Sequence, residues 1–192
     1  GTHELAGVIS VEVENVPPQI TLSGAAAADE GTPYTLLLGN VVDPGDDTVS
    51  HFIVNWGDNS QPDIYTTTGP VTHTYLDGTI QAQITVDLVD DDGPHLNVTQ
   101  PNSLQSAGLA ITVRDVAPTA NLSVSGTSQE GAPLKLNLQN VTDPGDDTIL
   151  GYQVDWGDGT SDTYDTPADM YHTYADNGTY TIAVDITSED GT

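Results

Sequence analysis

Carboxylates gathered in two matching pairs of loops are the residues of this sequence best suited to chemistry. Residues 42–48 read VDPGDDT and residues 142–148 read TDPGDDT. A second acidic stretch follows each of them, VDDDG at residues 89–93 and SEDG at residues 188–191. Carboxylate oxygens are hard ligands, and calcium accepts about six to eight of them in irregular geometry. The loops therefore predict calcium binding.

Two groups of calcium ligands are expected, because loops that connect alternate strands of a β-sandwich lie at the same end of it. The first group is predicted to be Asn15, Asp43, Asp46, Asp47, Asp90 and Asp92. The second group is predicted to be Asp115, Asp143, Asp146, Asp147, Glu189 and Asp190. Glu30 and Asp58 are expected at the opposite end of the first copy, facing the second group.

Carboxylates so close together repel one another unless protons or cations lie between them. The alternative interpretation is a solvated acidic surface, such as that of a salt-adapted organism, without a specific ion. Acids that are concentrated in matching loops favour ligation over this alternative.

No catalytic site is expected. The sequence contains no Gly-x-Ser-x-Gly or His-Glu-x-x-His arrangement, and every candidate pair of acidic residues occurs in both copies, which would require two equivalent active sites. We therefore interpret the chain as a non-enzyme.

The conspicuous aromatic and histidine residues are predicted to be structural. Trp56 and Trp156 share the phase of buried strand positions, so core packing is expected rather than sugar stacking. An Asp in a tight turn, such as Asp58, usually accepts hydrogen bonds from its own backbone. His73 and His172 each stand two residues before a Tyr, without a second His at metal spacing. His3, His51 and His95 are expected to face solvent.

The charge balance limits the partners. The 192 residues include 29 acidic side chains and two basic ones, for a formal net charge of −27, with 36% hydrophobic residues. Such a charge repels nucleic acid and anionic membrane surfaces, whereas the hydrophobic content is enough for a folded core. No cysteine is present, which leaves oxygen ligands for a metal.

An internal repeat organises the chain. Residues 56–58 (WGD) return as residues 156–158, and residues 73–75 (HTY) return as residues 172–174. The boundaries expected from this repeat are a closing strand of a preceding repeat at residues 1–15, one domain at 16–115, and a second domain at 116–192 that lacks its last strand. The sequence also lacks a membrane span and a signal peptide, so we expect an internal piece of a longer exported protein.

Each copy alternates apolar and polar residues with a period of two, which predicts strands with one buried face. The positions that alternate most clearly are Ile80, Ala82, Ile84, Val86 and Leu88, then Tyr180, Ile182, Val184 and Ile186, and also Leu109, Ile111 and Val113 with their N-terminal counterparts Ile9, Val11 and Val13. Short strands separated by Gly, Pro, Asn and Asp predict an all-β fold of tandem immunoglobulin-like sandwiches.

Residues 152–192 resemble the second half of a PKD (polycystic kidney disease) domain, which combines a WGDG turn, H-x-Y, G-x-Y and a closing acidic turn. The first copy departs from this pattern, with Asn59 in place of glycine and LDGTIQAQI in place of NGTYTIAV. The resemblance implies sandwich modules that act as spacers, adhesive modules or accessories of secreted and cell-surface proteins. It also implies calcium near the linker, as in some bacterial collagenases, which supports Asn15 and Asp115.

The function expected from these observations is that of a calcium-stabilised extracellular or cell-surface spacer or adhesion module, whose partners are neighbouring repeats. The alternative is a carbohydrate- or protein-binding accessory module, for which Tyr34, Tyr65, Tyr164 and Tyr171 are the candidate exposed aromatics. We also expect the unpaired edge of the second domain to accept residues 5–14 of another molecule, so that the chain self-associates by strand donation.

Overall fold

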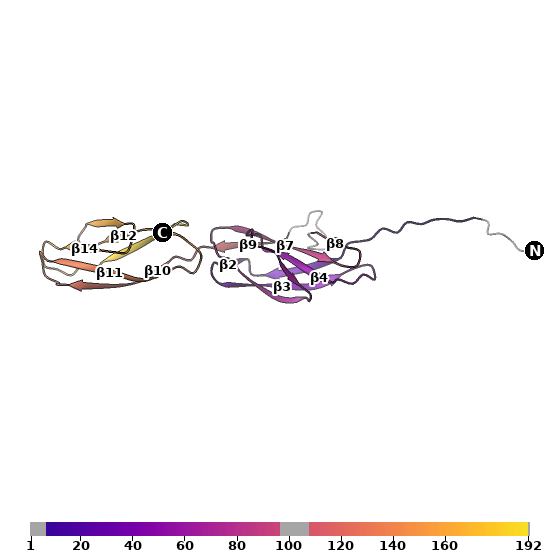
Figure 1. The fold of residues 1–192 in the computed structure, drawn as a ribbon, viewed down its shortest axis with the longest axis horizontal. Helices are drawn as coiled ribbons and strands as arrows, with labels where there is room; N and C mark the ends of the chain where they lie inside the picture. Colours follow the sequence, from indigo (N-terminus) through magenta and orange to yellow (C-terminus); the bar gives the residue numbers. More distant parts are fainter. Residues whose placement is uncertain (1–6, 97–107, 192) are drawn as a thin grey trace, which may run out of the picture. The chain divides into compact units, whose positions relative to one another are not determined.

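The structure is a computed structural model that describes residues 7–96 and 108–191. Every regular element in these ranges is a β-strand (Figure 1). The chain divides into two compact units that do not coincide with the sequence repeats. The first unit is Gly1–Gly24, Leu36–Val71 and Gln83–Leu109, and the second is Ala25–Thr35, Thr72–Ala82 and Ala110–Thr192.

Within residues 7–96 and 108–114, the first repeat contains nine strands. They are β1 (Gln19–Gly24), β2 (Ala27–Asp29), β3 (Pro33–Val42), β4 (His51–Asn55), β5 (Asp63–Tyr65), β6 (Gly69–Thr74), β7 (Gln81–Val89), β8 (Pro94–His95) and β9 (Leu109–Arg114). One sheet has the order β1-β3-β6, and the other has the order β2-β9-β7-β4-β5, with β8 also paired to β7.

The second repeat contains six strands in the described residues. They are β10 (Thr119–Gly126), β11 (Pro133–Thr142), β12 (Ile149–Asp155), β13 (Ser161–Tyr164), β14 (Met170–Thr173) and β15 (Ala183–Ser188). Its two sheets have the orders β10-β11-β14 and β13-β12-β15. The chain is therefore an all-β protein of tandem immunoglobulin-like sandwiches, and the predicted fold class is confirmed.

The period-two pattern predicts the buried face of β7 correctly, whereas Tyr180 and Ile182 of the second-repeat pattern precede β15. In β7 the side chains of Ala82, Ile84, Val86 and Leu88 are buried, while the residues between them are more exposed. Trp56 and Trp156 are fully buried, and each indole N–H donates a hydrogen bond to a carboxylate, at 2.8 Å to Asp63 and at 2.9 Å to Asp162. The prediction that both tryptophans belong to the core is confirmed.

The Trp-Gly-Asp turns are held as their sequence predicts. The Oδ1 atom of Asp58 accepts a hydrogen bond from the Ser60 N–H at 3.0 Å, and Asp158 accepts one from Thr160 at the same distance. Gly57 and Gly157 have φ angles of 81° and 79°, which glycine adopts without the strain that a Cβ would cause.

The N-terminal alternation does not form a strand within the described residues. Residues 7–18 have no strand assignment, and Ile9 and Val13 are 89% and 87% exposed. A strand needs a neighbour to accept and donate its backbone hydrogen bonds, because an isolated extended segment gains nothing over its hydrated form. The strand pattern of this segment is therefore present without the pairing.

Replacing Trp156 by Ala is expected to lower the free energy of unfolding by about 3–5 kcal/mol, because the cavity left by a fully buried side chain is only partly filled. Chemical denaturation measures this change. The control is Leu150→Ala in β12, the strand that ends just before Trp156, where a largely exposed side chain should change the stability by less than about 0.5 kcal/mol. Equal effects of the two substitutions would show that Trp156 does not organise the core.

Candidate metal centres

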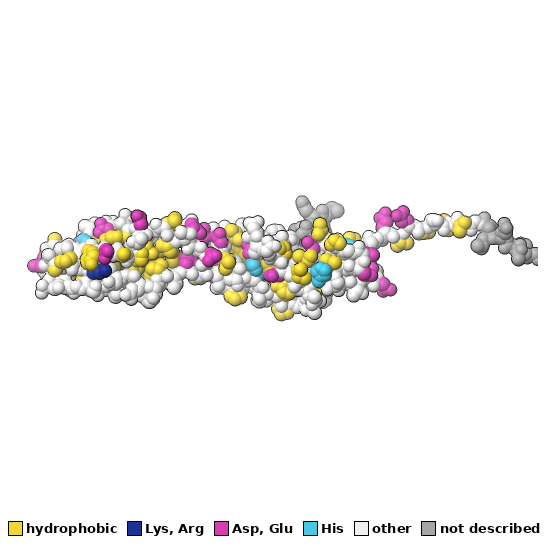
Figure 2. All heavy atoms as spheres, viewed as in Figure 1, with side chains coloured by type: hydrophobic (Ala, Val, Ile, Leu, Met, Phe, Trp, Pro, Cys, Tyr) yellow, Lys and Arg dark blue, Asp and Glu magenta, His cyan; other side chains and the backbone are white. Residues whose placement is uncertain are grey.

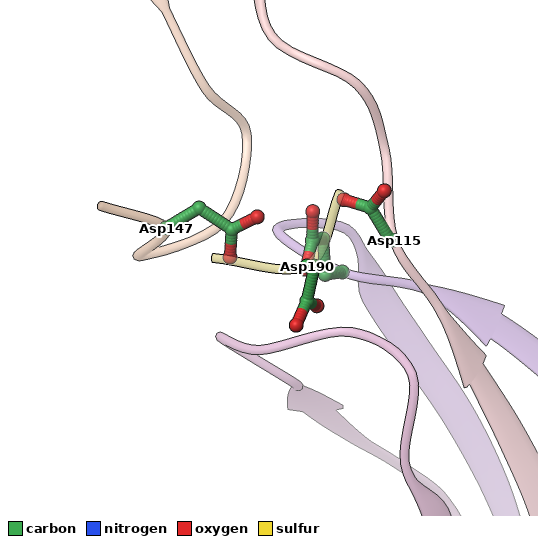
Figure 3. Close-up of side chains that lie close together, drawn as sticks. Asp115, Asp147 and Asp190 are labelled. Atoms are coloured by element: carbon green, nitrogen blue, oxygen red, sulfur yellow. The ribbon is translucent and has the colours of Figure 1, made fainter. Parts of the chain in front are cut away.

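Four carboxylates of the second compact unit meet at one point. Glu30, Asp115, Asp147 and Asp190 each place one oxygen so that all four oxygens lie within 4.8 Å of one another. Figure 3 shows the Asp115, Asp147 and Asp190 side chains converging from separate segments of the chain. We call this group the four-carboxylate cluster.

Strand pairing brings Glu30 and Asp115 together. β2 pairs in parallel with β9, with Asp29 opposite Arg114, so the next residue of each strand leaves the sheet at the same place. The Glu30 N–H donates to the Arg114 carbonyl at 3.0 Å, and Glu30 Oε1 accepts from the Val116 N–H at 2.8 Å. Two hydrogen bonds thus fix the Glu30 carboxylate beside the residues that follow β9.

The acidic loops of the second repeat supply the other two members. In the loop of residues 142–148, Asp143 Oδ1 accepts from the Gly145 N–H at 3.0 Å, and the Asp146 N–H donates to the Leu76 carbonyl at 2.7 Å. These contacts turn the loop so that Asp147 joins the cluster. Asp190 comes from the turn after β15, which the Ser188 N–H closes on the Gly191 carbonyl at 2.8 Å.

The cluster contains buried oxygens without hydrogen-bond donors. Glu30 is fully buried, and its Oε2 atom has no partner. The same holds for atoms of the other members and of the adjacent Asp143, namely Asp115 Oδ1, both Asp147 oxygens, Asp190 Oδ2 and Asp143 Oδ2. A buried carboxylate without a donor is strongly destabilising unless a proton or a cation compensates it.

Basic side chains do not supply that compensation. The sequence contains one Arg and one Lys, and each has an acidic partner elsewhere. Arg114 Nη1 lies 3.6 Å from Asp29 Oδ1, and Lys135 Nζ lies 3.5 Å from Asp169 Oδ1. A metal cation or bound protons must therefore balance the charge of the four-carboxylate cluster.

Two glycines leave room for the Glu30 carboxylate. A Cβ atom at Gly78 would lie 2.8 Å from Glu30 Oε2 and only 2.5 Å from the Asp115 Cα. A Cβ atom at Gly145 would lie 2.9 Å from the same Oε2 and 3.0 Å from the Leu76 carbonyl oxygen. Side chains larger than hydrogen at either position would displace the carboxylate or the backbone around it.

Burial and repulsion raise the pKa values of two cluster members, Glu30 and Asp147. Burial raises the pKa of Glu30 and outweighs the opposing hydrogen bond from Val116, and the charges of Asp147 and Asp115 raise it further. The pKa of Asp147 is also raised, first by burial and then by the charges of Asp143 and Asp190. Both shifts mean that the ion-free fold disfavours the ionised forms of these two carboxylates.

A second group of carboxylates lies in the first compact unit. Asp43, Asp47 and Asp90 place oxygens within 4.8 Å of one another, and we call them the three-carboxylate cluster. Asp90 is buried, and its Oδ1 accepts hydrogen bonds from the backbone N–H groups of Asp92 at 2.9 Å and Gly93 at 3.1 Å. Burial raises the pKa of Asp47, as do the charges of its acidic neighbours, Asp92 first among them.

The expectation that His95 faces solvent is wrong. Its Nε2 atom lies 2.8 Å from Asp90 Oδ2, outside hydrogen-bond geometry, and its side chain is largely buried. Although burial alone would raise the pKa of Asp90, His95 and the backbone donors outweigh it and lower that pKa. The short strand β8 pairs with the end of β7 and so carries His95 back onto the loop, which sequence spacing did not reveal. His3 lies outside the described residues.

The structure brings six of the twelve predicted ligands into the two clusters. Asp143 lies at the edge of the four-carboxylate cluster, where its charge acts on Asp147. The remaining predicted ligands have exposed side chains, and they are Asn15, Asp46, Asp92, Asp146 and Glu189. We expected Glu30 at the end of the first repeat that faces the second ligand group, but did not include it among the ligands. Its recurrence as Glu130 could have drawn attention to this position.

The motif histidine of the second repeat has structural contacts. The His172 ring stacks on Trp156 with centroids 4.8 Å apart, and its Nε2 atom lies 2.8 Å from Asp158 Oδ2. The Tyr174 hydroxyl donates to the Trp156 carbonyl at 2.9 Å. Hydrogen bonds from Thr160 and then from His172 lower the pKa of Asp158 to about 2. These contacts support the structural interpretation of the His-x-Tyr motif.

The surface agrees with the charge balance of the sequence. Figure 2 shows acidic side chains spread over the drawn face, with few basic ones. No helix of the described residues is long and apolar enough to cross a membrane.

Comparisons with known proteins match one family model to part of the chain. A family model described as a PKD domain matches residues 115–192. Among solved structures, fibronectin(III)-like modules of Clostridium thermocellum CbhA are similar at 16% identity, with a TM-score of 0.35 over 88% of this chain and 87% of theirs. A similarity of that size supports no inference about this chain. No curated protein is similar enough to count as a relative.

Asp158→Asn is expected to make the fold less sensitive to acid. Because the folded-state pKa of Asp158 is about 2, below its ordinary value of 3.8, the ionised side chain adds stability above pH 4 that is lost as the pH falls toward 2. Thermal melts between pH 5 and pH 2 should therefore show a smaller loss in the variant. Asp165→Asn, at an exposed position, is the control. A variant that loses as much stability as the wild type would contradict the role of Asp158.

Proposed function

Residues 115–192 belong to the PKD domain family, and from this premise we propose that the chain is a non-catalytic, calcium-stabilised spacer within a larger extracellular protein. PKD domains are typically non-catalytic modules and usually extracellular. The proposal adds to this what the ion does: it makes a junction between repeats rigid, so that the array holds other domains apart.

The observation that carries the proposal is the fully buried Glu30 carboxylate, whose Oε2 atom faces three aspartates without a donor. An acidic patch on a surface needs no ion, because water solvates each carboxylate. Glu30 is not solvated, and the two basic residues of the chain are paired elsewhere. A cation among the four oxygens satisfies them together.

The chemistry of the donors supports calcium. Every member of both clusters offers carboxylate oxygen, and the sequence has no cysteine for a softer metal. The donors come from loops and strand ends, whose geometry suits the irregular coordination of calcium better than the strict octahedron of magnesium. The three-carboxylate cluster is proposed as a second calcium site, with Asn15 and Asp92 as candidate outer ligands. Asp46, Asp146 and Glu189 remain candidates only through bridging water.

The ligand set connects the two repeats of the sequence. Glu30 and Asp115 come from the first repeat, whereas Asp147 and Asp190 come from the second. An ion bound by all four links these segments through strong oxygen contacts. Removing the ion leaves like charges facing one another, which favours separation of the segments.

The accessory binding module is less well supported. Of the four candidate tyrosines, Tyr34 is buried, Tyr65 and Tyr164 are partly buried, and Tyr171 is 50% exposed. Lys135 Nζ lies over the Tyr171 ring, 5.4 Å from its centroid. One half-exposed ring among the four candidates does not form the row of aromatics that a sugar-binding face requires.

Calcium is expected to raise the melting temperature of chelator-treated protein by roughly 5–10 °C when its free concentration is about 100 times Kd, because the folded state alone binds it. Glu30→Gln should remove most of this rise. Glu130→Gln is the matched control, since it changes the same residue type at the equivalent exposed position of the second repeat.

Differential scanning calorimetry in chelator, calcium and magnesium at equal ionic strength makes this comparison. Magnesium should raise the melting temperature much less than calcium. Identical melting curves in the three solutions would exclude the calcium site. An undiminished calcium response in Glu30→Gln would exclude the four-carboxylate cluster as its location.

Calcium is also expected to reduce the range of interdomain conformations that small-angle X-ray scattering detects. Asp147→Asn should weaken this effect, because it removes a cluster carboxylate. Asp165→Asn removes the same charge from an exposed side chain that is not a predicted ligand, and it should not weaken the effect. Scattering profiles that do not change with calcium would show that the ion does not stiffen the junction.

A further inference from the structure

The DPGDD loops of the two repeats turn in the same way. Asp43 Oδ1 accepts a hydrogen bond from the Gly45 N–H at 3.0 Å, and Asp143 Oδ1 accepts one from the Gly145 N–H at the same distance. The Oδ2 atoms of both aspartates are buried and have no hydrogen-bond partner. Each loop therefore fixes one aspartate through its first oxygen and leaves the second oxygen for a cation to bind.

The first repeat shows what this loop gathers without residues of another repeat. In the three-carboxylate cluster, oxygens of Asp43, Asp47 and Asp90 lie within 4.8 Å of one another. All three residues belong to the first repeat. The loop and the turn after β7 thus bring together oxygens for one cation. A corresponding ion position is therefore expected beside Asp143 and Asp147, and we call it the loop position.

The second repeat has the same parts with one exchange. The Ser188 N–H donates to the glycine carbonyl three residues later at 2.8 Å, as the Asp90 N–H does at 3.1 Å, so Ser188 stands in the place of Asp90. The Ser188 side chain is buried, and its hydroxyl accepts a hydrogen bond from the Asp190 N–H at 3.3 Å. This contact holds the turn from which Asp190 reaches the four-carboxylate cluster.

One ion does not account for all the buried oxygens of this region. Asp143 is not among the residues whose oxygens lie within 4.8 Å of one another in the four-carboxylate cluster. Calcium ligands lie about 2.3–2.6 Å from the ion, so two ligands of one ion are at most about 5 Å apart. An ion centred among the four oxygens therefore leaves the buried Asp143 Oδ2 atom without compensation.

Asp147 lies between Asp143 and the cluster. Both Asp147 oxygens are buried without a hydrogen-bond partner. Burial raises its pKa most, and among the neighbouring charges Asp143 acts most strongly, followed by Asp190. The Ser188 hydroxyl acts in the opposite direction, but it is outside hydrogen-bond geometry to either oxygen. Figure 3 shows the Asp147 carboxylate directed toward Asp190. A carboxylate with two such oxygens can bind a different cation through each.

The charge of the region also favours two ions. Its carboxylates belong to Glu30, Asp115, Asp143, Asp147 and Asp190. When all of them are ionised, one calcium ion leaves a formal charge of −3 among them, and two leave −1. Residual like charge in a buried place is unfavourable, and no basic side chain offsets it, since Arg114 and Lys135 have acidic partners elsewhere.

We infer that the second repeat binds two calcium ions next to each other, with Asp147 as the bridge between them. The first ion contacts Glu30, Asp115 and Asp190 together with one Asp147 oxygen. The second ion, at the loop position, contacts Asp143 Oδ2 and the other Asp147 oxygen, and water completes its coordination. Two cations bridged in this way lie about 4 Å apart. The inference rests on the proposed calcium site and adds a second ion to it.

Equilibrium dialysis against radioactive calcium counts the ions. The full chain first receives Asp47→Asn and Asp90→Asn, which remove two members of the three-carboxylate cluster, so that the calcium counted belongs to the second repeat. Excess magnesium occupies the exposed acidic side chains. This protein should bind two calcium ions per chain, and addition of Asp143→Asn should leave one. The control Asp165→Asn, at an exposed position, should leave two.

Asparagine at position 143 keeps the Oδ1 acceptor for the Gly145 N–H, so the loop retains its turn. Thermal melts in calcium check that each variant is folded. A count of one that Asp143→Asn does not change overturns the inference and leaves the proposed calcium site intact. A count of zero overturns the proposed site as well. Two ions that persist in Asp143→Asn overturn the assignment of the loop position.

Luminescence of bound lanthanide ions tests whether the two ions are neighbours. Terbium and europium ions bind hard oxygen ligands, and excitation passes from terbium to europium when both occupy nearby sites of one chain. The protein with the disabled three-carboxylate cluster should show europium emission on terbium excitation, and Asp143→Asn should abolish it. Two bound ions per chain without this transfer would place the ions far apart and would overturn the Asp147 bridge.

Discussion

The Glu30 carboxylate is fully buried, and the structure around it depends on keeping that charged group out of water. Parallel pairing of β2 with β9 fixes its backbone, the Val116 N–H holds one oxygen, and Gly78 and Gly145 yield space for the other. Three aspartates then face an oxygen that has no donor. A folded protein tolerates a buried carboxylate when a positive charge or a bound proton compensates its charge. This requirement makes the site chemically specific, although aspartate and glutamate are common surface residues.

The two repeats of the chain can be compared with each other. β7 and β15 have the same alternation, but Ala82, Ile84, Val86 and Leu88 of β7 are buried, whereas Val184 and Ile186 of β15 are only partly buried. The difference follows from β9, which covers one sheet and has no described equivalent in the other. The alternation thus predicts which residues face inward, whereas their burial depends on whether another segment covers them. The N-terminal segment has the same alternation, but within the described residues it has no paired neighbour and forms no strand.

The sequence predicted the sandwiches, the buried tryptophans and the acidic loops because these depend on periodicity and on turn chemistry, which are local. It did not separate Asp47 from Asp46 or Asp147 from Asp146, because neighbouring residues of a loop point in different directions that backbone hydrogen bonds decide. Glu30 was missing from the ligand set because its role arises from the β2–β9 pairing across more than 80 residues of sequence. His95 was misplaced for a similar reason, since β8 returns it to Asp90.

The scarcity of basic residues has a consequence beyond electrostatics. A protease that cleaves after Lys or Arg has two target bonds in the whole sequence. One follows Lys135 within β11, and the other joins Arg114, the last residue of β9, to Asp115 of the four-carboxylate cluster. Neither bond can enter a protease cleft until its strand leaves the sheet, because cleavage requires an extended and accessible segment. Digestion at Arg114 is thus coupled to the opening of the cluster itself, and surroundings rich in such proteases would degrade the chain only at the rate at which β9 or β11 detaches.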